Sequence, residues 1–250
     1  MRQQAQAQRD DDIVQDFIEF SLEWLQGKRY TLSIDVDMAA WTRVMTGAMS
    51  AAAVNPTFNP ALNRLTPHNS FWLDVREGSH TVATMAARLF LTDDYLALKR
   101  SMRLWRDEPP PELGELSLSV PEDMPLIHGR VGHEGGLWVH PEHRKRGLSV
   151  ILPHLIRALC LRQWSIDWQT GVTRRAIGEC GIAKWAYGMP HQEPLFEGHF
   201  PITGANDRLF IAYMSRQELV AGLDAAKVVE RLPDIREQPS YAGALARNKG

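Results

Sequence analysis

The chain has 250 residues, 44% of them hydrophobic, which is enough for one large domain or two small ones around a real core. A formal net charge of -2 argues against a nucleic-acid-binding surface spread over the whole protein, because such surfaces carry a basic excess. Two cysteines, Cys160 and Cys180, cannot form a disulfide framework and fit a reducing compartment. Residues 1–12 lack the apolar core of a signal peptide, and no run approaches the roughly 20 apolar residues of a membrane span. We therefore expect a cytoplasmic protein with no membrane span and no nucleic-acid partner.

In the first half of the chain, apolar residues recur either at helical spacing or in the alternation typical of strands. In chain order they predict a helix over 13–25, a strand over 31–36, a helix over 38–54, a hairpin of strands over 71–76 and 81–90, and a helix over 93–105. Residues 91–126 are interrupted by prolines, and we interpret them as an insertion with a short strand at 116–118.

The second half continues the alternation of strands and helices. It predicts a strand over 129–140, a helix over 148–164, a strand over 166–170, a helix over 175–187, a strand over 209–214 and a last helix over 216–232. Pro153 belongs within the first turn or two of its helix, where a missing N–H matters less. The polar tail after Pro233 is predicted to be mobile.

The segment from Gly135 to Ser149 is the most informative part of the chain. An apolar strand runs into a basic, glycine-containing turn that opens a long amphipathic helix. Such a turn presents unpaired backbone N–H groups and a helix N-terminus to an anion, beside the cationic side chains of Arg144, Lys145 and Arg146. Glycine at position 147 allows a phosphate to approach the backbone closely. The pattern indicates a pyrophosphate site, and the alternative is a basic helix start whose charges face water.

The order of these elements, together with the turn Arg144-Lys145-Arg146-Gly147-Leu148-Ser149, resembles the GNAT superfamily of acyl-CoA-dependent N-acyltransferases. The resemblance covers roughly residues 30 to 215. It implies an α/β (α+β) fold with a mixed, mostly antiparallel sheet of six to seven strands flanked by helices, preceded by a helical extension (1–29) and followed by a C-terminal helix and tail (216–250). It also implies acetyl-CoA or another acyl-CoA as co-substrate. The residues that it implies at the cofactor are Leu137, Trp138, Val139, Arg144, Lys145, Arg146, Gly147, Leu148 and Ser149.

The resemblance points to two catalytic residues. Glu134 lies about where many relatives carry a base on the fourth strand. Its neighbour His133 points to the opposite face if the strand is regular, and a bulge would reverse the choice between the two residues. The family's usual acid is a tyrosine, and Lys184 stands at its place here. Tyr187 is the substitute, although it projects from a different face of its helix. Alternatively, Glu134 caps a strand end or faces solvent, and Tyr187 is a core or surface residue.

Several other groups have competing interpretations. Five histidines cluster in sequence, but no set of converging ligands completes a metal site, so we expect no metal. These histidines are His128, His133, His140, His143 and His154. Cys160 and Cys180 are expected to be core residues, and Trp168 either packs in the core or lines the cleft. A methionine stripe at Met38, Met45 and Met49 suits an acyl chain, or else core packing.

The sequence thus predicts an acetyltransferase that acts on a primary amine of a small molecule. One alternative is an N-acyl synthase that uses long-chain acyl-CoA or an acyl carrier protein, for which a basic face would be suitable. That face would comprise Arg144, Lys145, Arg146, Arg157 and Arg162. A second alternative, motivated by Lys184, is a catalytically idle module that binds acyl-CoA. The sequence also leaves a homodimer open.

Overall fold

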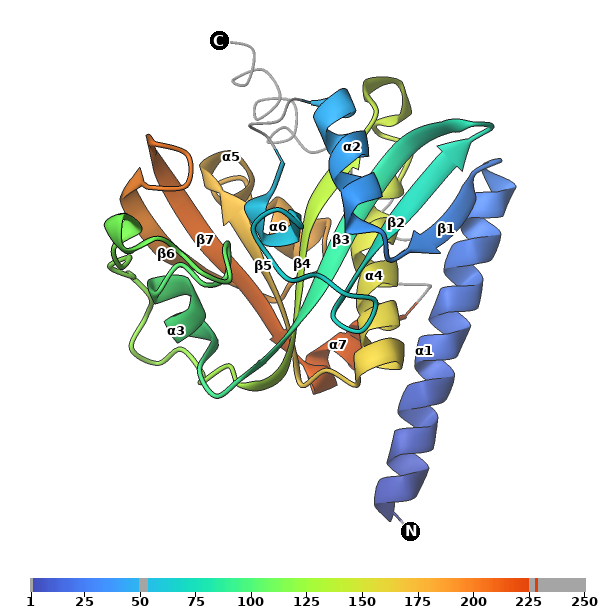
Figure 1. The fold of residues 1–250 in the computed structure, drawn as a ribbon. Coiled ribbons are helices and arrows are strands. Elements are labelled where there is room, and N and C mark those ends of the chain that lie inside the picture. The colour runs from blue at the N-terminus through green and yellow to red at the C-terminus, as the bar shows by residue number, and fades with distance from the viewer. Residues whose placement is uncertain (1, 50–53, 225–227, 229–250) are drawn as a thin grey trace.

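The structure is a computed structural model that describes residues 2–49, 54–224 and 228. A seven-stranded sheet, flanked by helices on both faces, dominates these residues (Figure 1). Its strands are β1 (Thr31–Asp35), β2 (Ser70–Glu77), β3 (His80–Thr92), β4 (Gly129–Val139), β5 (Trp168–Arg174), β6 (His191–Phe200) and β7 (Ala205–Ser215). The α-helices are α1 (Arg2–Gly27), α2 (Met38–Ala48), α3 (Tyr95–Arg100), α4 (Leu148–Trp164), α5 (Arg175–Gly178), α6 (Ile182–Trp185) and α7 (Arg216–Gly222), and 3₁₀ turns are η2 (Pro56–Phe58), η3 (Pro111–Leu113) and η4 (Pro141–His143).

The strand order is β1-β2-β3-β4-β5-β7-β6. Among the pairs of the described sheet, only β4 and β5 run parallel, and all others are antiparallel. This mixed, mostly antiparallel sheet with flanking helices confirms the GNAT-like fold class expected from the sequence.

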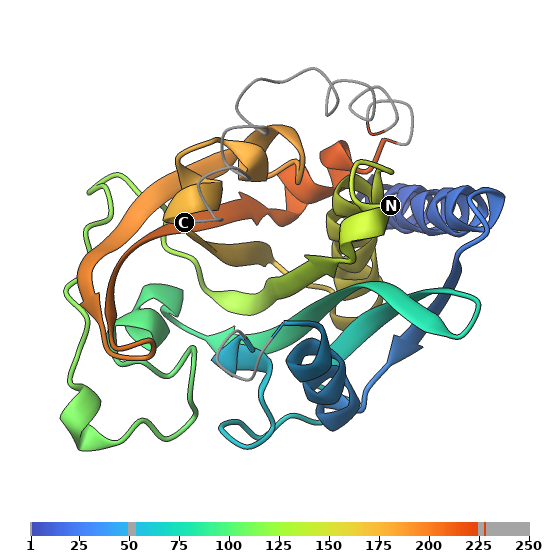
Figure 2. The same cartoon turned by 90° about the horizontal axis from the view of Figure 1, so that it is seen from above.

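The two faces of the sheet are covered differently. Helices α1, α4 and α7 lie on one face, whereas α2, η2 and α3 lie on the other (Figure 2). Side chains of α1 and α4 pack with one set of alternating strand residues into the largest core cluster, for example Phe17, Leu155 and Leu73. A second cluster, around Tyr95, lies under α3 and the 91–126 segment, and a third, around Trp41, lies under α2. Both faces of the sheet are therefore buried.

Some predicted boundaries were wrong, and each has a local cause. The helix predicted over 93–105 ends at Arg100, because Met102 adopts a left-handed backbone with φ 63°. The helix predicted over 175–187 is two single turns separated at Gly181, where φ is 70°. Residues 116–118 form no strand. Leu116 N–H instead donates to the Arg100 carbonyl at 2.8 Å.

Strand boundaries also differed from the predictions. Strand β5 begins at Trp168 and ends at Arg174, rather than spanning 166–170. Strand β6 was absent from the predicted elements, because Pro194 and Gly198 interrupt its alternation. Pro153 lies in the second turn of α4, as predicted. The ends of the predicted helices 38–54 and 216–232, and the tail, include residues outside the described ones.

No helix within the described residues is both long enough and apolar enough to cross a membrane.

Candidate active site

Strands β4 and β5 pair over a short stretch only and then separate. Their register runs from Val131 opposite Trp168 to Glu134 opposite Gly171. Beyond Glu134, β4 continues to Val139 without a β5 partner. Three predicted cofactor residues, Leu137, Trp138 and Val139, lie on this part of β4 and are half-buried. No other strand of the described residues pairs with this edge of β4, which is therefore open to an extended ligand from that part of the chain.

A bulge in β4 follows the separation point. The β3–β4 register shifts between Thr84 and Ala86, and Gly136 in the bulge has φ 63°. A Cβ on Gly136 would lie 2.4 Å from Cζ2 of Trp41, and one on Gly135 would lie 2.9 Å from Cε2 of Phe58. The paired glycines therefore let α2 and η2 pack directly on the strand backbone.

The turn between β4 and α4 has the geometry of an anion site. Lys145 has φ 61° and Gly147 has φ 91°, so two left-handed residues fold the backbone back just before the helix. Within the described part of the chain, the backbone N–H groups of Lys145 through Ser149 donate no hydrogen bond, whereas Val150 and Ile151 N–H both donate to the Gly147 carbonyl. Consecutive free N–H groups at the start of a 17-residue helix form an anion-binding concavity.

Neighbouring side chains hold this turn in place. The Arg144 guanidinium donates from Nε to the Val139 carbonyl at 3.2 Å, which ties the turn to the end of β4. His143 is buried and bonds through Nδ1 to the Tyr30 hydroxyl at 2.9 Å. The side chains of Arg144, Lys145 and Arg146 are exposed, so their charges face the solvent around the free N–H groups. All the residues predicted at the pyrophosphate therefore surround one turn.

Glu134 lies on the opposite side of β4 from α2, beneath helix α4. Both of its carboxylate oxygens are engaged by Arg157: Nη2 donates to Oε1 at 2.5 Å and Nε donates to Oε2 at 2.8 Å. Gln169 of β5 donates to Oε2 at 3.0 Å. The ion pair is buried, with side-chain exposures of 2% for Arg157 and 6% for Glu134. A base at this position would have to abandon a bidentate partner to accept a proton.

Arg157 also connects this pair to the other predicted catalytic residue. Its Nη1 donates to the backbone carbonyl of Tyr187, just after α6. Tyr187 is half-buried, and Lys184 is exposed on α6. Arg157 therefore joins α4, β4 and the chain after α6 at the level where β4 and β5 separate. It does not belong to an exposed basic face, as the carrier-protein alternative had assumed.

His133 lies on the other face of β4. The sequence predicted that its side chain would point away from that of Glu134, and we gave it no catalytic role there. It is 1% exposed and stacks on Phe58 with a ring separation of 5.8 Å and an interplanar angle of 14°. Its Nδ1 lies 2.7 Å from the Tyr95 hydroxyl and 3.3 Å from Oγ1 of Thr170. Tyr95 belongs to the segment interpreted as an insertion, and no sequence signal linked it to β4.

Two buried cations accompany His133. Arg88 of β3 donates from Nη2 to Asp107 at 2.6 Å and from Nη1 to Asn63 at 2.8 Å, but its Nε has no partner among the described residues. Lys99 of α3 is 0% exposed, and its Nζ has no hydrogen-bond partner in the described part of the chain. Burial holds the pKa of the Lys99 ammonium well below its ordinary value. This face of β4 therefore keeps donors that the fold itself does not satisfy.

The other residues that the sequence analysis singled out lie away from the place where β4 and β5 separate. Met38 and Met45 are buried under α2, and Met49 is exposed. Trp168 pairs with Val131 at the closed end of the β4–β5 pair, and its partly buried side chain packs against the cluster around Tyr95. Cys160 is buried, and burial together with the charge of Glu134 raises its pKa well above the ordinary value, which makes it a poor nucleophile.

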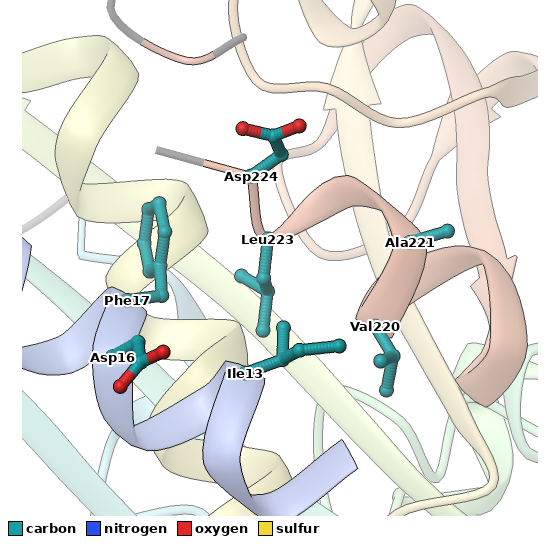
Figure 3. A pocket seen from close by; sticks show the side chains of 7 residues that line it. All are labelled: Ile13, Asp16, Phe17, Val220, Ala221, Leu223 and Asp224. Atoms are coloured by element: carbon teal, nitrogen blue, oxygen red, sulfur yellow. The ribbon is translucent and has the colours of Figure 1, made fainter. Parts of the chain in front are cut away.

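A surface groove of about 420 Å³ lies between α1 and α7 (Figure 3). Its lining is Ile13, Asp16, Phe17, Val220, Ala221, Leu223 and Asp224, and it contains no candidate residue.

Among the described residues, no three His, Cys, Asp or Glu side chains form a group that could hold a metal ion. The separation of β4 from β5, with the turn beside it, is thus the candidate active site.

A scan against protein-family models and a search of curated proteins return no match. Among solved structures, the chain is similar to FeeM, an N-acyl amino acid synthase from uncultured soil microbes (9% identity, TM-score 0.41, 74% of this chain and 91% of that one). It is also similar to a spermidine N-acetyltransferase SpeG chimera from Vibrio cholerae and hSSAT (9%, 0.42, 76% and 98%) and to NAA60 of Arabidopsis thaliana in complex with acetyl-CoA (12%, 0.41, 74% and 98%). At such values, assignment of a function has to rest on the site itself.

Proposed function

We propose that this protein is an acyl-CoA-dependent N-acyltransferase, most simply an acetyltransferase that acts on a primary amine of a small molecule. The observation that carries the proposal is the turn from Lys145 to Ser149. It offers consecutive free N–H groups, a helix N-terminus and exposed cations at the end of a strand that has just lost its parallel neighbour. A nucleotide diphosphate that carries an extended arm is one of the few ligands that would bind both to this turn and along the free strand edge.

In this proposal, the diphosphate of acyl-CoA binds the N–H groups of the turn, and the arm lies along the free edge of β4. Lys145 and Arg146 meet phosphate oxygens as solvated charges. The thioester then reaches the point where β4 and β5 separate, between the Glu134 and His133 faces. The co-substrate, acetyl-CoA or a longer acyl-CoA, remains part of the proposal.

The chemistry is direct attack on the thioester. A neutral amine attacks the carbonyl carbon, the carbonyl π electrons move to oxygen, and the tetrahedral intermediate collapses with loss of the thiolate. The proton lost by the amine ends on the thiolate through water. The amide and free coenzyme A are the products.

Glu134 and Tyr187 remain predicted catalytic residues, with roles that the contacts now constrain. Since Arg157 and Gln169 occupy the Glu134 carboxylate, we propose that Glu134 acts mainly by positioning β4 against α4. Deprotonation of the amine then falls to water or to the solution. Substitution of Glu134 by Gln leaves the buried Arg157 without its ionised partner and should lower the melting temperature in either role. The pH profile of kcat/KM distinguishes the roles: loss of an acidic limb in E134Q would indicate a base, whereas a profile of unchanged shape would indicate positioning.

The carrier-protein alternative loses one of its supports, because Arg157 is buried rather than part of a basic face. The alternative of a catalytically idle module would be contradicted by turnover of an acyl-CoA that depends on an added amine. We keep the cytoplasmic location and a homodimer as predictions from the sequence alone.

The test of the proposal combines binding and turnover. Thermal-shift and native mass-spectrometric titrations with acetyl-CoA, longer acyl-CoAs and free coenzyme A should show stabilisation that increases with ligand concentration. Release of free thiol in the presence of a panel of amino acids, polyamines and aminoglycosides should then identify an acceptor. Binding without any amine-dependent thiol release would favour the idle module. Absence of binding by every acyl-CoA and by coenzyme A would contradict the proposal.

A further inference from the structure

The side chain of His133 occupies a particular place at the candidate site. It is the last side chain on the η2 face of β4 before the strands separate, because the next residue on that face is Gly135. Its ring is held between Phe58, on which it stacks, and Phe90, which meets it edge-on at 6.3 Å. Within the described residues, both side-chain hydrogen bonds of the ring are at Nδ1, which leaves Nε2 available to a ligand.

The hydrogen bonds at Nδ1 determine which ring nitrogen carries the proton. Thr170 Oγ1 lies 2.8 Å from the Tyr95 hydroxyl and 3.1 Å from the Gly132 carbonyl, and the Tyr95 hydroxyl lies 2.7 Å from Nδ1. A phenol is a stronger donor than a neutral imidazole N–H, and an imidazole nitrogen is a stronger acceptor than a phenol oxygen. The phenol therefore donates to Nδ1, and the proton of the neutral ring lies on Nε2.

The surroundings also keep this ring neutral. Burial, followed by the positive charges of Lys99 and Arg88, holds the pKa of His133 well below its ordinary value. Burial raises the pKa of the Tyr95 hydroxyl, so it stays protonated and remains a donor. The groups facing His133 thus favour one form, a neutral imidazole with Nε2–H.

We propose that His133 donates a hydrogen bond from Nε2–H to the thioester oxygen and stabilises the oxyanion that forms when the amine attacks. This inference rests on the proposed function and adds a catalytic residue to it. No proton leaves His133 in the step: the π electrons of the carbonyl move to oxygen, the oxyanion accepts the N–H bond, and the oxygen returns to a carbonyl as the C–S bond breaks. Tyr95 and Thr170 are positioning residues, since they act through the imidazole.

The test compares three variants with the wild type. H133F keeps an aromatic ring among Phe58, Phe90 and Tyr95 but removes the donor. Its kcat should fall about 100-fold to 1000-fold, the cost of removing one oxyanion donor, with the Kd for acyl-CoA little changed. The melting temperature should fall as well, because the buried Tyr95 hydroxyl loses its acceptor, so kcat is compared at a temperature where both proteins are folded. H133Q, which can place an amide N–H near the position of Nε2, should recover part of kcat. Y95F should fall between the wild type and H133F, because the ring loses the bond that holds its tautomer.

A spectroscopic readout avoids dependence on the acceptor. In difference infrared spectra with acetyl-CoA labelled with carbon-13 at the carbonyl, the bound thioester band should lie at lower wavenumber in the wild type than in H133F. Nitrogen-15 NMR should show His133 with its proton on Nε2 near neutral pH, identified by the signal missing from H133F.

The outcomes separate this inference from the function it rests on. H133F that keeps wild-type kcat or the wild-type carbonyl band would overturn the role of His133 and leave the acyltransferase proposal standing, as would a ring protonated on Nδ1. Failure of the wild type to bind any acyl-CoA would overturn both.

Discussion

The two faces of β4 differ at neighbouring residues. Beneath α4, Glu134 has a full set of partners in Arg157 and Gln169. On the opposite face, Lys99 Nζ and Arg88 Nε are buried without hydrogen-bond partners among the described residues, and the hydrogen bonds of His133 there are both at Nδ1. A saturated buried pair contributes to the architecture, whereas unsatisfied buried donors lower stability and are retained where a ligand uses them. We therefore expect substitutions at Glu134 to act mainly on stability and substitutions at His133 to act mainly on turnover.

The largest expected effect is on the saturated face. Replacement of Arg157 by Met leaves the Glu134 carboxylate buried without its partner, and we expect a loss of about 3–5 kcal/mol in the free energy of unfolding. The matched control is Arg175→Met, which removes an exposed pair with Glu197 and should change it by about 0–1 kcal/mol. Urea unfolding followed by circular dichroism measures both. Equal effects of the two substitutions would show that the Glu134 pair does not hold the fold.

On the unsatisfied face, the same kind of substitution should have the opposite sign. Lys99→Met removes a buried amine that has no hydrogen-bond partner among the described residues and whose one ring contact there is with Tyr95, so the protein should gain about 1–3 kcal/mol in free energy of unfolding. Since the native-state pKa of Lys99 is depressed, the unfolded chain binds its proton more tightly than the native chain does. Stability of the wild type should therefore rise with pH between the native and unfolded pKa values of this lysine, and K99M should flatten that rise. Destabilisation by K99M at neutral pH would contradict the contrast between the faces.

The bulge that separates the faces can be tested with two alanine substitutions. Gly136 and Gly78 have nearly equal φ values, 63° and 60°, but an added Cβ meets Trp41 only at Gly136 and meets nothing within 4 Å at Gly78. G136A should therefore lose about 1–3 kcal/mol more than G78A through overpacking. Thermal melts of the pair provide the measurement, and equal losses would mean that only backbone strain matters there.

The smallest expected effect on stability is that of Asp107, which forms an ion pair with Arg88. Burial alone would raise the pKa of Asp107, but hydrogen bonds from the Arg64 backbone N–H and from Arg88, together with the charge of Arg88, hold the pKa below its ordinary value. A carboxyl with a depressed native pKa contributes stability above its unfolded pKa and loses that contribution as the pH falls through the native value. Because Asp107 is partly exposed, the contribution should be less than about 1 kcal/mol. In acid melts, D107N should show a shallower loss of stability than the wild type, and identical acid slopes would argue against this pair.

The sequence predicted the secondary-structure elements around the candidate site better than the contacts within it. The β2–β3 hairpin, helix α4 and the turn at Gly147 follow from local patterns, and the structure contains all three. The role of Glu134 depended on which face of β4 the helix covers, a tertiary property that alternation along one strand does not contain. Tyr95 and Lys99 were not predicted because they reach His133 from a proline-rich segment about forty residues away, where only packing brings them together.

The single most direct test of the account is acyl-CoA binding at the Gly147 turn. Glutamate at Gly147 places a negative charge and a side chain at the free N–H groups, while Gly204→Glu adds the same residue at another left-handed glycine, with φ 64° and open space around it. We predict by isothermal titration calorimetry that G147E weakens acetyl-CoA binding by about 100-fold or more, whereas G204E binds as the wild type does. Wild-type affinity in a folded G147E protein would contradict the assignment of the turn as the diphosphate site.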